Sequence, residues 1–92
     1  MTFKELVENS VAVSALQLTQ TLEEHASSGS AISSRVVRAL VRRIPNLTNE
    51  DFEKLYQSAL KGRANQEALG HTGDAAEYNS VAEYLDQFIN FI

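Results

Sequence analysis

The chain has 92 residues, of which 43% are hydrophobic and 22% charged, and its formal net charge is -4. This length fills a single domain, residues 1–92, and the composition excludes intrinsic disorder. The absence of cysteine excludes disulfides, thiolate nucleophiles and thiolate metal sites. No apolar run approaches the roughly 18 residues of a membrane span, and the N-terminus lacks the pattern of a signal peptide. We therefore expect a cytoplasmic protein.

The first predicted helix covers residues 3–26. Thr2 and Glu5 have the spacing of a capping box, which marks a helix start. Valines alternate with small residues around Val11 and Val13, which would also fit a strand, but a lone strand would leave its backbone unpaired. The apolar residues recur every three or four positions, as on one face of a helix, at Phe3, Val7, Val11, Ala15, Leu18, Leu22 and Ala26.

A flexible connector is expected at 27–33, where serine and glycine dominate and the side chains are too small and polar to pack. The second predicted helix covers residues 34–44. Ser33 or Ser34 can cap its start, and Pro45 disfavours helical geometry at the residue before it.

The second helix has a basic side. Its valines, leucine and isoleucine occupy one face, whereas Arg35, Arg38 and Arg42 fall within about 60° of one another on the opposite face. Arg43 lies on the flank of that group. No acidic residue occurs between 26 and 49, so these four arginines should form a positively charged surface, which we call the arginine stripe.

The third predicted helix covers residues 49–69. Thr48 and Asp51 have the spacing of a capping box, and Gly70 supplies the left-handed residue that ends many helices.

The fourth predicted helix covers residues 75–91, with Asp74 and Glu77 at its start. Its apolar face spans about half of the circumference, which indicates a helix packed on two sides or covered by another chain. We therefore expect a homodimer, with an interface formed by Tyr84, Phe88, Phe91 and Ile92.

These elements predict an all-α fold, a compact bundle of about four helices. The sequence shows no catalytic arrangement. His25 and His71 are isolated and lack the spacing of metal ligands, and nothing places a nucleophile or base beside either imidazole. We expect His25 to sit at a helix C-terminus and His71 to be solvated. We also expect no enzyme activity, no metal and no cofactor.

The arginine stripe is the feature with functional content, and three interpretations of it remain open. It can grip phosphates of a nucleic acid, pair with acids of the fourth helix, or bind an acidic protein surface. The overall acidity of the chain and the lack of aromatic residues on the second helix argue against nucleic acid. The favoured interpretation is a protein-interaction module: a small regulator, inhibitor or accessory subunit of the kind that viruses and mobile elements encode.

Overall fold

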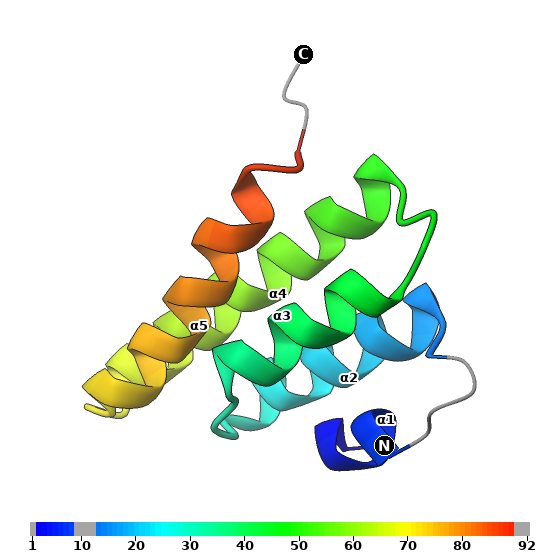
Figure 1. Cartoon of the computed structure of the whole chain (residues 1–92). Helices are drawn as coiled ribbons and strands as arrows, with labels where there is room; N and C mark the ends of the chain where they lie inside the picture. The colour runs from blue at the N-terminus through cyan, green and yellow to red at the C-terminus, as the bar shows by residue number, and fades with distance from the viewer. Residues whose placement is uncertain (1, 9–12, 90–92) are drawn as a thin grey trace.

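The computed structural model describes residues 2–8 and 13–89 and contains five helices in that part of the chain (Figure 1). No strand occurs there, so the predicted all-α bundle is confirmed. None of these helices is both long and apolar enough to cross a membrane. The helices are α1 (Phe3–Glu8), α2 (Ala15–Ser28), α3 (Ser34–Arg43), α4 (Asn49–Ala68) and α5 (Thr72–Asp86).

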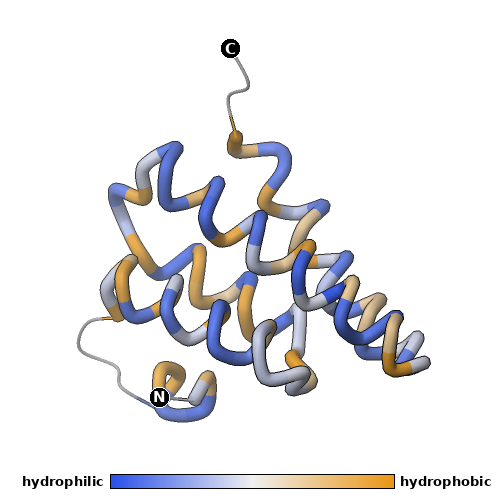
Figure 2. Tube along the Cα trace, turned by 180° about the vertical axis from the view of Figure 1, so that it is seen from behind, coloured by the Kyte–Doolittle hydropathy of each residue, from blue (hydrophilic) through white to orange (hydrophobic). Residues whose placement is uncertain are grey.

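The helices form a closed circuit around one core. Helix α4 packs against both α2 and α5, α5 packs against α3, and α3 packs against α1. The circuit closes where the Phe3 ring of α1 lies 4.7 Å from the His25 ring of α2. Each helix turns its hydrophobic residues inward, so polar and apolar colours alternate along the tubes in Figure 2. Because α5 contacts both α3 and α4, much of its wide apolar face is covered within its own chain.

The prediction of one continuous helix over 3–26 is wrong, because Val13 and Ser14 are not helical. Ser14 has extended backbone angles, and its hydroxyl accepts a hydrogen bond from the Gln17 amide at 3.1 Å. The Gln17 side chain accepts the Ser14 amide in return, at 2.9 Å. This capping box gives α2 its own start and separates it from α1. The predicted residue Val11 lies outside the described residues.

Because the helix is broken, the buried faces of α1 and α2 need not follow one continuous helical repeat, and the buried residues of α1 show that they do not. Leu6 is fully buried, whereas Val7, which belonged to the predicted apolar face of residues 3–26, is 42% exposed. On α2 the predicted apolar face is confirmed at Leu18, Leu22 and Ala26, which are all buried.

The connector between α2 and α3 is shorter than the predicted 27–33, because Ser27 and Ser28 complete the last turn of α2. Gly29 then ends the helix in the left-handed conformation, with φ of 74°. The flexibility of the connector stays a prediction. The structure shows that its backbone carbonyls are held by side chains of other helices.

A buried polar network holds this connector. The fully buried Gln66 donates its amide hydrogens to the carbonyls of Gly29 and Ser30, at 2.6 and 3.3 Å. The Tyr78 hydroxyl donates to the same Ser30 carbonyl at 2.6 Å. Burial, and secondarily the charge of Asp74, raises the pKa of Tyr78 to about 12. Two carbonyls of the connector, just beyond the end of α2, are thereby satisfied by side chains of α4 and α5.

The start of α5 also differs from the prediction. The helix begins at Thr72, three residues before the predicted 75, and His71 at its cap makes no side-chain capping bond. Glu77, predicted together with Asp74 to mark the start of this helix, instead accepts the Ser34 amide at 3.2 Å and so caps α3 from outside. At the other end α5 stops at Asp86, before the predicted 91.

Candidate functional site

The arginine stripe lies on the outer side of α3. Ser33 caps the helix, as predicted, by accepting the Val36 amide, and the apolar residues Val37, Leu40 and Val41 face the core. This orientation leaves the guanidinium-bearing side chains outside: Arg35, Arg42 and Arg43 are exposed and Arg38 is half-buried.

The stripe makes no ion pair with the part of the chain that the structure describes. The ion pairs found there join other residues, such as Lys61 with Glu23 at 3.0 Å and Lys54 with Glu50 at 3.4 Å. The interpretation in which the arginines pair with the acidic last helix therefore receives no support from α5. Arg38 donates its Nε hydrogen to the Ser34 carbonyl at 3.3 Å, which directs its side chain back along α3.

The end of α5 brings an aromatic residue to the stripe. The Arg42 guanidinium carbon lies 5.5 Å from the centre of the Tyr84 ring, within the range of a cation–π contact. The Phe88 ring packs edge-on against Tyr84 at 5.2 Å and stacks on Phe52 of α4 at 5.1 Å. We call Phe52, Tyr84 and Phe88 the aromatic cluster. It joins the basic helix α3 to the end of α5.

The predicted dimer interface is described only in part. Phe88 is 43% exposed and Tyr84 is half-buried, and each contacts aromatic or basic groups of its own chain. Phe91 and Ile92 lie outside the described residues. Within the same chain, Ile89 is buried and helps to close the core at this end of α5.

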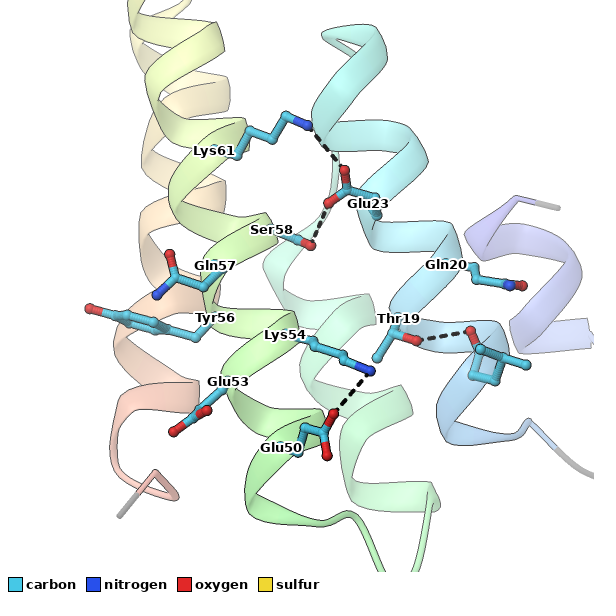
Figure 3. A pocket seen from close by; sticks show the side chains of 11 residues that line it. Thr19, Gln20, Glu23, Glu50, Glu53, Lys54, Tyr56, Gln57, Ser58 and Lys61 are labelled. Atoms are coloured by element: carbon cyan, nitrogen blue, oxygen red, sulfur yellow. Dashed lines mark hydrogen bonds and ion pairs between the residues drawn. The ribbon is translucent and has the colours of Figure 1, made fainter. Parts of the chain in front are cut away.

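A second surface feature is an open groove of about 1030 Å³ between α2 and α4 (Figure 3). Glu23 reaches across it from α2 and accepts hydrogen bonds from Lys61 at 3.0 Å and Ser58 at 2.9 Å. These bonds, together with one from Ser27, lower the pKa of Glu23. In Figure 3, Tyr56 points away from α2, so the aromatic ring does not close over the groove. Because the bonds of Glu23 to Lys61 and Ser58 cross the groove, we interpret it as a structural contact between α2 and α4.

The two histidines are both hydrogen-bonded. His25 lies near the end of α2, as predicted, and its Nδ1 donates to the Thr21 carbonyl at 2.8 Å. His71 is 55% exposed, but it is not only solvated, because its Nδ1 lies 3.0 Å from the Gln66 side-chain oxygen. Over residues 2–8 and 13–89, no three His, Asp or Glu side chains gather where they could hold a metal ion.

Sequence reasoning missed Phe52 as a surface residue, because its place in the apolar stripe of α4 fits a core role equally well. The half-exposed position follows only from the meeting of the α4 start with the α5 end. The comparisons with known proteins add no analogy to this geometry: no protein-family model, curated protein or solved structure matches the chain.

Proposed function

We propose that this chain is a non-catalytic interaction module that docks on a protein partner with an acidic surface. The contact is made by Arg35, Arg38, Arg42 and Arg43 of α3 and by the adjoining end of α5. A small cytoplasmic regulator, inhibitor or accessory subunit acts in this way, by covering a surface of a larger protein.

The observation that carries the proposal is the combination, at one place, of half-exposed aromatic rings with arginines that form no ion pair with residues 2–8 and 13–89. Arg42 lies over Tyr84, and Phe88 beside it is 43% exposed. Arginine and aromatic side chains are enriched in the centres of protein interfaces, where they contribute most of the binding energy. An arginine that already rests on a ring loses little conformational freedom on binding, because its side chain is already ordered.

Nucleic acid is the competing partner for a basic helix. The chain carries a formal net charge of -4, however, and α3 itself has no aromatic residue that could stack on a base. These two features favour a protein over a nucleic acid.

Affinity capture from the native host tests the proposal, with a nuclease treatment before elution. The double variant Arg38→Glu, Arg42→Glu should lose the captured protein while keeping its circular dichroism spectrum and melting temperature. Lys4→Glu, Lys54→Glu is the matched control, because it makes the same change in net charge at exposed positions on other helices. Capture that survives the arginine reversal would reject the stripe as the contact, and capture that nuclease abolishes would favour nucleic acid.

The homodimer stays a prediction, and it would use the same end of the molecule. Sedimentation equilibrium over the micromolar range should show a mass that rises with concentration and that Phe88→Ala reduces to the monomer value. A monomer mass throughout would contradict it.

A further inference from the structure

Helices α3 and α5 lie side by side and run in the same direction. Near their starts, the Ser34 amide donates to Glu77 at 3.2 Å. Near their ends, Arg42 lies over the Tyr84 ring. These two contacts are separated by eight residues on α3 and seven on α5, each spanning roughly 11 Å at about 1.5 Å per residue. The two helices therefore stay in register along a shared surface.

Arg38 lies on the same edge of α3 as Ser34 and Arg42, one helical turn from each. The surface thus presents Arg38, Arg42, Tyr84 and Phe88 in that order from the middle of α3 to the end of α5. We call these four residues the α3/α5 seam. The seam is basic at its middle and apolar at its end, where Phe88 is 43% exposed.

The donors of both arginines remain available for a ligand. Among the residues that the structure describes, Arg38 bonds only the Ser34 carbonyl, through its Nε hydrogen, and Arg42 makes no hydrogen bond. A guanidinium that rests on an aromatic ring keeps its N–H groups directed outward, where they can bind a carboxylate through two parallel hydrogen bonds. Two carboxylates could be held at once, about 6 Å apart, which is one helical turn.

The apolar end of the seam further restricts the kind of ligand that can bind. Phe88 rests on Phe52 and Tyr84, so its exposed side forms a rigid apolar surface. A ligand that follows the seam must therefore change from acidic to uncharged and apolar beyond its second carboxylate.

We propose that the seam binds an acidic amphipathic helix of the partner, with two carboxylates one turn apart and a bulky apolar side chain one further turn along the same face. This inference rests on the proposed function and specifies its partner. The carboxylates pair with Arg38 and Arg42, and the apolar side chain covers Phe88. The helix binds in one direction, because the basic and apolar parts of the seam have a fixed order.

Fluorescence anisotropy with two labelled synthetic helical peptides tests the inference. The matched peptide carries Glu at positions i and i+4 and Leu at i+8, and the shuffled peptide has the same composition with Leu on the opposite face. We expect the matched peptide to bind about tenfold more tightly than the shuffled one. Phe88→Ala should remove that preference. Leu16→Ala, which truncates a side chain that is 64% exposed on α2, is the control and should leave binding unchanged.

The outcomes separate this inference from the proposed function. Equal binding of the two peptides, or a preference that survives Phe88→Ala, overturns the amphipathic ligand and leaves the arginine stripe standing. Failure of both peptides to bind also overturns it, while host capture by the arginines judges the function independently. Peptide binding that is unaffected by Arg38→Glu, Arg42→Glu also overturns the amphipathic ligand, because its carboxylates would then not pair with the arginines. Circular dichroism of each variant checks that the helices are retained.

Discussion

Gly62 allows α4 to approach α5 closely, because it has no side chain where the Tyr78 ring packs. It lies in the middle of α4, a position where glycine is intrinsically unfavourable, and it is buried against Tyr78. A methyl group added at Gly62 would overlap three carbons of the Tyr78 ring. The ring cannot easily retreat, because Tyr78 is fully buried and its hydroxyl is bonded to the Ser30 carbonyl at 2.6 Å. We therefore predict that Gly62→Ala destabilises the bundle.

The expected change in the free energy of unfolding combines two destabilising effects and one stabilising effect. Overpacking a core costs about 1–3 kcal/mol, and loss of the Tyr78 hydrogen bond costs about 1 kcal/mol more. Replacing a helical glycine by alanine returns about 1 kcal/mol. The expected net loss is about 1–3 kcal/mol, and for a domain of this size each kcal/mol corresponds to roughly 4–8 °C in melting temperature.

Thermal and urea unfolding followed by circular dichroism measure this loss. Gly73→Ala is the matched control, because nothing lies within 4 Å of its added methyl in the first turn of α5. That variant should gain roughly 0.4–1 kcal/mol through a less flexible unfolded chain. Tyr78→Phe frees the ring from Ser30, so the double variant with Gly62→Ala should cost less than the sum of the two single changes. A Gly62→Ala protein as stable as the Gly73→Ala protein would refute the close-contact explanation.

Three further predictions concern titration and capping. The contribution of Glu23 to stability is present above its unfolded-state pKa near 4.5 and is lost as the pH falls through its lower folded-state pKa. Urea unfolding at neutral and acidic pH should therefore show a steeper acid loss for the wild type than for Glu23→Gln, and parallel curves would contradict the Glu23 contacts. For Tyr78 the sign is opposite: stability is present below the unfolded-state pKa near 10 and is lost as the pH rises through about 12. An ultraviolet titration of tyrosinate should show one late component that Tyr78→Phe removes, and a titration complete near pH 10 would count against burial of that hydroxyl. Ser14→Ala should lower the free energy of unfolding by about 1 kcal/mol, as measured by urea unfolding, whereas no loss would indicate that α2 does not need this cap.

Local signals were enough to predict most of the helices. The capping box of Thr48 and Asp51 and the left-handed Gly70 mark the ends of α4 within one residue. Pro45 likewise places the end of α3 within one residue: the helix ends at Arg43 and not at the predicted 44, because a proline disfavours helical geometry at the residue before it.

The predictions failed where two local sequence signals competed, or where a contact between residues far apart in the sequence determined the structure. The apolar spacing of 3–26 fits one helix, but the Ser14 capping box ends that continuity, and both patterns are present in the sequence. Glu77 has the spacing of a cap for its own helix, yet it caps α3 across the bundle. The buried Gln66 carries no pattern that predicts its bonds to the connector, because those partners lie 36 and 37 residues away.

The candidate site likewise has one part that local sequence signals predict and one part that depends on helix packing. The positions of Arg35, Arg38 and Arg42 on one face follow from the helical period alone, and the structure places them outside the core. The contact of Arg42 with Tyr84 depends on the packing of α3 against α5, which no local pattern specifies.

Chemical-shift mapping tests the central claim most directly, with the matched acidic peptide added to labelled protein and amide spectra recorded at increasing peptide concentration. The proposed surface predicts that the largest shifts follow Arg38, Arg42, Tyr84 and Phe88 along α3 and the end of α5. Shifts centred on the groove between α2 and α4, or spread evenly over the bundle, would contradict it.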